Sequence, residues 1–225
     1  MDTLFPTAPS NKGIISIMFL KLTSLQTVSL DALREAWQAD LNLQITDTEW
    51  SDIFTRIHSS SICARHGLLQ FKVAHRLHLS KARIAKMYPT IDDSCNRCNF
   101  SPATLAHTFW SCPRLSGYWS SIFDALSKIF KKPIKPNPLT AIFGIQCEDD
   151  HLPRAQSDRI AFVTLLARRI ILLNWKQAAP PSYKHWVKDT LQLLKLEKIR
   201  LALRRPNDNF SRIWQTFITY LLEQV

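Results

Sequence analysis

The sequence predicts a mainly α-helical protein with little or no β-sheet, assembled irregularly from several helices. Three observations lead to this fold class. Only four of the 225 residues are glycine, which disfavours an architecture rich in β-hairpins. Apolar residues recur with helical spacing along most of the chain, and proline or capping residues bound many of these stretches. Hydrophobic residues make up 46% and charged residues 21% of the chain, so there is enough apolar material for a folded core.

The N-terminal part of the chain divides into a lead and a helical region. Residues 1–27 show no clear hydrophobic period, and we expect a flexible lead there. Residues 28–92 are expected to form an N-terminal helical region that contains a block of basic residues. Its first helix begins after Ser29, which can cap it, and continues to Leu41 along an apolar stripe.

Three further helices are expected in this region. Residues Thr46 to Glu49 form a capping box, and apolar residues follow it at helical spacing. A third helix is expected over 61–78, although Gly67 weakens it. A short fourth helix is expected over 80–87, since a serine precedes it and a proline follows it.

The C-terminal helical region, residues 116–225, follows a cysteine-containing segment, residues 93–115. A proline-containing linker, a polar loop and a pair of prolines separate its helices. Ser157 is expected to cap a long buried helix that continues to about Trp175. The expected helices cover residues 113–130, 157–175, 182–205 and 210–222, with the linker at 131–138 and the loop at 146–153.

Basic residues outnumber acidic ones, and they cluster. The net charge of +11, from 29 Lys and Arg against 18 Asp and Glu, favours a polyanionic partner such as nucleic acid. Residues 65–91 contain six Lys and Arg and no acid, and residues 159–205 contain eleven against two acids. The alternative of a solvated basic face without a ligand stays open. The candidate nucleic-acid-binding residues are Lys72, Arg76, Lys81, Arg83, Lys86, Arg97 and Arg114.

One group of residues has the spacing of a metal site. Cys95, Cys98, His107 and Cys112 form the pattern Cys-x2-Cys-x8-His-x4-Cys. Zn²⁺ takes four sulfur or nitrogen ligands in a tetrahedron, and a structural site fills all four positions with protein groups. We therefore expect one structural Zn²⁺, with the helices assembled around a small Cys3His zinc knuckle. The alternative is that these cysteines are only small core residues, which do not require this spacing.

The residues between the ligands predict how the ligands are held. A short helix is expected over 102–110, with Ser101 as its N-cap, and this helix presents His107. Pro113 is expected to end that helix, because proline cannot continue it, and to keep Cys112 near the metal.

Two other sets of side chains have alternative interpretations. The histidines and the cysteine of the basic block can be combined into a second metal site, but the many cations and the lack of acids disfavour a dication there. Its members would be Cys63, His66, His75 and His78. The aromatic residues beside the knuckle can stack on unpaired bases or form the small core of the metal site, and the core is favoured. These residues are Phe100, Phe109 and Trp110.

Four short stretches support a family resemblance. They are Arg76 to Lys81 (RLHLSK), Met87 to Pro89 (MYP), Phe109 to Pro113 (FWSCP) and Leu194 to Arg200 (LKLEKIR). Together with the Cys/Cys/His/Cys block, they resemble the C-terminal segment of LINE-type, non-LTR retrotransposon reverse transcriptases, most of all those of fish-type elements. The similarity covers roughly residues 28–225.

The resemblance implies a place in a larger protein. In that family the segment lies downstream of an endonuclease and a polymerase domain, and it is thought to bind zinc and element RNA near the target-priming step. By position, the zinc ligands would again be Cys95, Cys98, His107 and Cys112.

Catalytic carboxylates of a polymerase or nuclease are not found in the sequence. Template-directed polymerisation needs carboxylates that hold two metal ions about 3.5 to 4 Å apart. The acidic candidates are residues 92–93 and 148–150, which lie in expected loops and lack the aromatic-x-Asp-Asp form. We therefore expect neither catalysis nor a small-molecule substrate.

These observations predict a non-catalytic, zinc-stabilised module that binds RNA or other single-stranded nucleic acid. The alternative is a protein-interaction scaffold that docks on the polymerase or endonuclease parts of the retrotransposon protein, and its sign would be an exposed apolar surface. The apolar density of residues 160–173 and 187–203 fits such docking, and it also fits an internal core.

Cysteine usage and hydropathy predict the compartment. Five cysteines, an odd number, favour a reducing compartment over a secreted disulfide framework. The apolar patch 13–22 is too short to cross a bilayer, and two arginines interrupt the apolar run 160–173. We expect an intracellular protein of the cytoplasm, the nucleus or both, not secreted and without a membrane partner.

Overall fold

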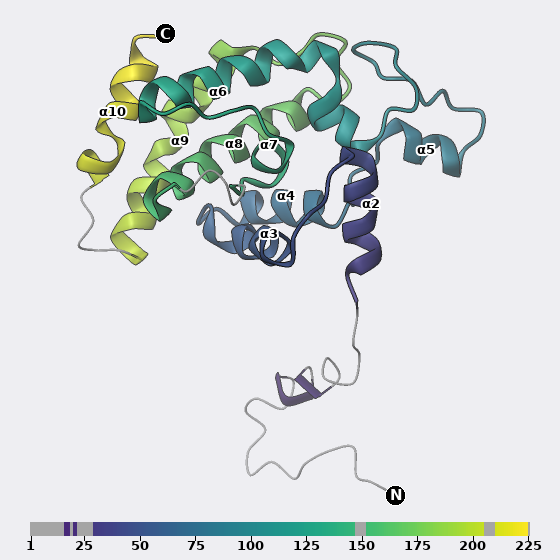
Figure 1. Ribbon diagram of the computed structural model, residues 1–225, viewed down its shortest axis with the longest axis horizontal. Coiled ribbons are helices and arrows are strands. Elements are labelled where there is room, and N and C mark those ends of the chain that lie inside the picture. The colour runs from purple at the N-terminus through teal and green to yellow at the C-terminus, as the bar shows by residue number, and fades with distance from the viewer. Residues whose placement is uncertain (1–15, 19, 22–28, 147–151, 205–209, 225) are drawn as a thin grey trace, which may run out of the picture.

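The computed structural model describes residues 16–18, 20–21, 29–146, 152–204 and 210–224 (Figure 1). Throughout these residues the regular structure is helical and there is no strand, so the predicted mainly α fold is confirmed. Most of the expected lead, residues 1–27, and the middle of the expected loop 146–153 lie outside the described residues.

Helices connected by short turns make up both halves of the fold. In the N-terminal half they are α2 (Asp31–Leu41), α3 (Asp47–Ser59), α4 (Ala64–Ala74) and α5 (Lys81–Met87). A π-helix, η1 (His107–Ser111), and a 3-10 helix, η2 (Pro113–Leu115), follow in the cysteine-containing segment. The C-terminal half consists of α6 (Ser116–Phe130), α7 (Pro138–Phe143), α8 (Arg154–Leu173), α9 (Tyr183–Arg204) and α10 (Phe210–Leu222).

Local capping explains where several helices begin. The predicted capping box of α3 is confirmed: the Glu49 N–H donates to Thr46 Oγ1 at 3.2 Å, and the Thr46 N–H donates to Glu49 Oε2 at 2.9 Å. The Ser80 hydroxyl accepts from the Arg83 N–H at the start of α5, also as predicted. The expected cap of α2 by Ser29 is not found: Leu30 holds the cap position without a side-chain cap bond, and the Ser29 hydroxyl, one residue earlier, accepts from the Asp31 N–H at 3.1 Å.

Two expected boundaries are wrong, and one helix was not expected. The third helix ends at Ala74 and not at residue 78, because Arg76 adopts a left-handed conformation with φ 53° that turns the chain. Helix α8 begins at Arg154, so Ser157 lies one turn inside it and its hydroxyl accepts a hydrogen bond from Arg56 instead of capping. Helix α7 was not expected: it follows the predicted linker directly, and Asn137 caps it by accepting from the Leu139 N–H at 2.7 Å.

Helix α8 forms the centre of the core. It contacts α4, α7 and α9, and Figure 1 shows α6 on one side of it and α3 and α4 on the other. Nearly all its side chains from Ser157 to Ile171 are buried. The apolar density of this stretch therefore belongs to the interior of the protein up to Ile171, and only Leu173 at its end is exposed.

Buried tryptophans connect distant segments through their ring N–H groups. Trp37 donates to the carbonyl of Ala74 at 3.0 Å, and Trp186 donates to the carbonyl of Val163 at 3.0 Å. These bonds satisfy polar atoms that burial removes from water. They fix α2 against the end of α4 and α9 against α8.

A buried arginine lies at the meeting point of α4, α7 and α8. Arg168 is fully buried, and its guanidinium donates to the Ala141 carbonyl at 2.8 Å and to Gln70 Oε1 at 3.1 Å. Burial lowers its pKa to about 9. Part of the basic block 159–205 therefore has a structural role in the core.

The cysteine-containing segment packs into the same core as the helices. Cys95, Leu105, Phe109 and Cys112 belong to the hydrophobic cluster that also contains the buried residues of α6 and α8. The expected regions 28–92, 93–115 and 116–225 are therefore joined by continuous packing. No described helix is both long enough and apolar enough to cross a membrane.

Candidate metal centre

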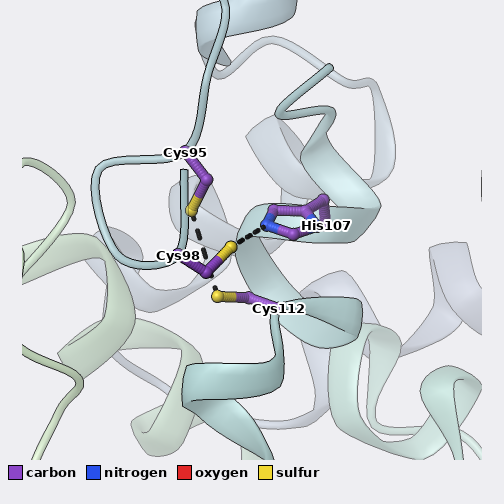
Figure 2. A group of neighbouring side chains, drawn as sticks. All are labelled: Cys95, Cys98, His107 and Cys112. Carbon is purple, nitrogen blue, oxygen red and sulfur yellow. Dashed lines mark hydrogen bonds between the residues drawn. The ribbon is translucent and has the colours of Figure 1, made fainter. Parts of the chain in front are cut away.

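The four predicted metal ligands lie together in space. One ligand atom each from Cys95, Cys98, His107 and Cys112 falls within 4.8 Å of the others, and Figure 2 shows the side chains converging. The Sγ atoms of Cys95 and Cys112 are 3.9 Å apart, and Cys98 Sγ lies 3.3 Å from His107 Nε2. This arrangement can hold one metal ion. In the described part of the chain it is the only such group of His, Cys, Asp and Glu side chains.

A tight turn brings the first two cysteines together. The Asn99 N–H donates to the Cys95 carbonyl at 2.8 Å, and the Cys95 N–H donates to the Phe100 carbonyl at 2.8 Å. Asn99 takes a left-handed conformation with φ 60°, which asparagine tolerates better than most residues. The Arg97 N–H points back at Cys95 Sγ at 3.4 Å. The turn therefore brings the sulfur atoms of Cys95 and Cys98 close together, and it supplies a backbone hydrogen bond to Cys95 Sγ.

A π-helical turn aligns the other two ligands, in place of the expected helix over 102–110. Residues 101–104 are not helical, and the Ser101 hydroxyl donates to the Asp93 carboxylate instead of capping a helix. Helical structure is confined to residues 105–111, where the His107 N–H bonds to Thr104 Oγ1 at 3.2 Å. The Cys112 N–H then donates to the His107 carbonyl at 3.0 Å, five residues back, which is the π-helical hydrogen bond.

The five-residue step of the π-turn matches the spacing of the two ligands. An α-helix repeats every 3.6 residues, so positions five apart do not share a face, whereas a π-turn closes a wider ring. Pro113 then ends the turn, as predicted, because it has no N–H to donate. A residue before proline favours extended backbone, and Cys112 has φ −63° and ψ 121°. The sulfur of Cys112 is thereby held beside the imidazole of His107.

A buried cation lies next to the sulfur atoms. Arg97 is 6% exposed, and it donates from Nη1 to the Thr108 carbonyl at 3.0 Å and from Nη2 to the Asn174 carbonyl at 3.4 Å. Burial lowers the pKa of Arg97, while the neighbouring thiols of Cys95, Cys98 and Cys112 act in the opposite direction. Arg97 thus stabilises thiolates and joins the π-turn to the end of α8.

Burial and hydrogen bonding set the protonation of the ligands. Burial raises the pKa of the Cys112 thiol to about 12. Burial acts in the same direction on Cys95, but hydrogen bonds from the backbone N–H groups of Arg97 and Cys98 outweigh it and lower the pKa of that thiol. The pKa of His107 is lowered by burial and then by the charge of Arg97, so its ring is neutral at pH 7, as a metal ligand must be.

The cluster is enclosed. Cys95, His107 and Cys112 are each at most 4% exposed, and only Cys98 is partly exposed. Four protein donors would complete a tetrahedral shell around one bound ion, which is the arrangement of structural metal sites.

The seven candidate nucleic-acid-binding residues separate into two groups. Lys72, Arg83, Lys86 and Arg114 are exposed, and Lys81 is partly exposed at 3.7 Å from Asp92. Two others are engaged inside the protein, so the structure does not place them for phosphate contact. Arg97 is buried at the metal centre, and Arg76 pairs with Asp40 and lies 4.5 Å above the ring of Trp37.

Much of the later basic block is also engaged internally. Arg200 is buried, and its Nε and Nη2 atoms donate to the Glu197 carboxylate at 2.9 and 2.7 Å. Arg169 pairs with Asp189 at 2.7 Å, and Arg159 donates to the Ile213 carbonyl and packs over a phenylalanine ring. The charge of residues 159–205 therefore overstates the basic surface there. The exposed lysines of this block are Lys176, Lys184, Lys188, Lys195 and Lys198.

The disfavoured second metal site does not assemble among the described residues. His66 Nδ1 bonds to the Ser61 hydroxyl at 3.0 Å. His75 packs against Phe71, with ring centroids 4.2 Å apart. His78 packs against Phe109.

The aromatic residues beside the cluster are mostly core, in agreement with the favoured interpretation. Phe109 is fully buried, and Trp110 packs against Trp119 and Phe123. Phe100 differs, because it is 56% exposed and stacks on the His107 ring at 5.1 Å between centroids. It shields one face of a metal ligand.

The sequence did not reveal two features of this region. One is the burial of Arg97, which depends on α8, a segment far away in the chain. The other is that α5 has no buried residue, although its alternation of small apolar and basic residues is visible in the sequence.

Searched against protein-family models, the chain matches none.

Proposed function

We propose that this chain is a non-catalytic, zinc-stabilised module that binds RNA or other single-stranded nucleic acid. The proposal has two parts, a structural zinc ion and a basic surface. The metal part rests on the four converging ligands, and the binding part rests on the exposed basic residues of α4 and α5.

Ligand type and geometry favour zinc. Three thiolates and an imidazole form a common ligand set for structural Zn²⁺, with Zn–S near 2.3 Å and Zn–N near 2.0 to 2.1 Å. A regular tetrahedron with these bond lengths has S–S edges of about 3.8 Å and S–N edges of about 3.6 Å. The distances of 3.9 Å between Cys95 and Cys112 and 3.3 Å between Cys98 and His107 are close to these edges. With three thiolates, a dication leaves one negative charge, which Arg97 balances.

Helix α5 is the observation that carries nucleic-acid binding. It has no buried side chain, and it lies at one edge of the molecule (Figure 1). Arg83 and Lys86 are exposed on it, Lys72 is exposed on α4, and the sequence from 65 to 91 has no acid. A helix that contributes so little to the core is suited to contact a partner, and its charge selects a polyanion.

The family resemblance agrees with this proposal. We propose that the chain resembles the C-terminal segment of LINE-type retrotransposon reverse transcriptases in function as well as in sequence. In that case an intracellular RNA partner, and the polymerase and endonuclease parts of the retrotransposon protein, are the expected surroundings.

Salt-titrated binding of single-stranded RNA tests the binding part. Affinity should fall steeply as salt rises, because phosphate contacts release counterions. The triple variant Lys72→Gln, Arg83→Gln, Lys86→Gln should bind more weakly, and the slope of log K against log salt should flatten by about 0.7 for each phosphate that the variant no longer neutralises.

The matched control neutralises exposed lysines elsewhere. The triple variant Lys188→Gln, Lys195→Gln, Lys198→Gln removes the same number of charges from exposed positions of α9, and it should change the affinity and the salt slope less than the α4 and α5 variant does. Salt-independent binding, or equal reductions in affinity for both variants, would contradict a specific role for α4 and α5.

A second candidate function, protein docking, is favoured by one observation. Exposed large apolar side chains gather before, on and after α5, and this surface suits a protein partner. They include Leu77, Leu79, Met87, Tyr88 and Ile91. Tight association with a polymerase domain in the absence of nucleic acid would support docking, whereas α5 variants that lose only RNA binding would favour the first function.

A further inference from the structure

A small cleft opens beside the metal centre, between α5 and the end of α8. Its volume is about 210 Å³. Apolar groups supply most of its wall, among them Leu79, Ile84 and Ala103, and Trp175 adds an indole ring. The cleft is well below the roughly 300 to 1,000 Å³ typical of sites for drug-sized ligands. It has room for one flat ring system and not for a larger ligand.

Positive charge surrounds this apolar cleft. Lys81 from α5 and Lys176 from the segment after α8 line it. Arg97 also belongs to its wall, but the cysteines of the metal centre balance its charge, so the two lysines supply the positive charge of the cleft. Among the described residues, no Asp or Glu belongs to that wall. Lys81 lies 3.7 Å from Asp92, but both groups are solvent-exposed enough that this pair is weak.

This combination matches one class of ligand. A nucleobase is flat and largely apolar on its faces, and in single-stranded nucleic acid it is flanked by phosphates. The apolar walls of the cleft complement the faces of a base. The lining lysines, with no carboxylate in the described wall, complement the flanking phosphates. The exposed Arg83 and Lys86 on the same helix extend the positive surface away from the cleft.

We propose that the cleft lined by Leu79, Ile84, Trp175, Lys81 and Lys176 receives one unpaired nucleobase of a bound single strand, while the lysines contact its phosphates. This inference rests on the proposed function, because it names the part of the strand that the module reads. The metal centre supports the cleft, since Cys95 and Arg97 form part of its wall. The basic surface binds the phosphates of any strand, and the cleft strengthens binding only when the strand carries a base that can enter it.

Two probes separate the base from the backbone. One is an oligouridylate, and the other is a ribose-phosphate strand of the same length without bases. The wild-type chain should bind the oligouridylate about 5- to 150-fold more tightly, the range that one base–aromatic contact supplies. Leu79→Trp fills the cleft and should abolish this advantage, while binding of the base-free strand persists.

Matched variants control for folding and for other aromatic surfaces. Leu77→Trp places the same side chain at an equally exposed position (47% against 49%) that does not line the cleft, and it should keep the advantage. Phe100→Ala removes the exposed ring on the knuckle and should also keep it. Photo-crosslinking with 4-thiouridine should label the peptide that contains Trp175 and Lys176.

The outcomes distinguish the two proposals. Equal wild-type affinity for both strands would overturn the cleft while leaving nucleic-acid binding intact. An advantage that survives Leu79→Trp, or that disappears in Phe100→Ala alone, would also overturn it. Binding of neither strand would overturn the proposed function and the cleft with it, and the cleft would then suit an apolar side chain of a protein partner.

Discussion

Arg97 combines three roles in one side chain. It places a positive charge beside three thiols, donates to the carbonyl of Thr108 in the π-turn, and donates to the carbonyl of Asn174 at the end of α8. A buried charge is stable only when its partners are in place, and the thiolates depend on it in turn. The metal centre and the C-terminal helices are therefore coupled through this residue.

Arg97→Met should be strongly destabilising. The change leaves two buried carbonyls and the thiolates without their cation, which lowers the free energy of unfolding by about 3 to 5 kcal/mol. Metal affinity should fall about 10- to 100-fold, as for other groups that support metal ligands. Chemical denaturation and competition with a zinc chelator measure the two effects.

The control for this variant is Arg114→Gln, which neutralises an exposed arginine near the same site. It should change stability by no more than about 0.5 kcal/mol. Equal effects of the two substitutions would show that burial of Arg97 has no special importance.

Cys98→Ser removes the ligand that is most accessible. A structural metal site stabilises the fold through its binding free energy, so the variant should bind the metal far more weakly and melt at a lower temperature. Metal analysis after dialysis and thermal denaturation measure both. Cys63→Ser, at a cysteine outside the cluster, should retain the metal, and loss of metal in both variants would contradict the assignment of ligands.

At the level of elements, the π-turn determines how two ligands meet. The five-residue spacing from His107 to Cys112 corresponds to the π-helical hydrogen bond between the same residues. Pro113 stabilises the extended backbone at Cys112 before any metal binds. The five-residue spacing of His107 and Cys112, together with Pro113, therefore determines how these two ligands meet.

Pro113→Ala should weaken the site without abolishing it. Removing this restraint gives the unfolded chain more freedom and costs about 0.4 to 1 kcal/mol, and apparent metal affinity should fall about two- to fivefold. Pro136→Ala in the exposed linker is the matched control and should leave metal affinity unchanged. An unaltered affinity in Pro113→Ala would contradict the role given to the extended backbone of Cys112.

Local signals predicted some elements well and failed for others. The capping box of α3 and the serine cap of α5 are sequence-local, so both could be predicted. Helix α7 was not predicted, because the prolines before it are typical of a linker. Its N-cap is Asn137, a capping signal that these prolines obscure. The short helix before Cys112 begins later than predicted, because Ser101-Pro102 resembles a helix start while the Ser101 hydroxyl is used by Asp93.

At the level of the whole molecule, charge was the least predictable property. The number of arginines can be counted in the sequence, but which of them are buried cannot. Arg76, Arg97 and Arg168 are structural through contacts with segments remote in the chain. The four metal ligands could be predicted, because the pattern of thiolates and imidazole lies within one short segment. Surface charge requires the tertiary fold.

Acid should destabilise the whole protein through buried imidazoles. Burial, and then the charge of Arg169, lowers the pKa of His66, and burial and then Lys72 lower that of His78. Below an ordinary histidine pKa of about 6.5 the unfolded chain takes up protons that the folded chain resists, so the free energy of unfolding falls. Above that pH the contribution is fully present.

Urea denaturation between about pH 7 and about pH 5 measures this dependence. His66→Gln should flatten part of the decline, because the unfolded variant no longer gains that proton. His185→Gln, at an exposed position, should leave the decline unchanged. Stability that rises toward acid pH would contradict the role of the buried imidazoles.

The most direct measurement of the central claim is X-ray absorption spectroscopy at the zinc edge, combined with metal analysis of the purified full chain. The account predicts one zinc per chain, with three sulfur ligands at about 2.3 Å, one nitrogen ligand at about 2.0 to 2.1 Å and no water ligand. A chain that purifies folded without metal, or a zinc ion with a water oxygen in its shell, would contradict a closed structural site.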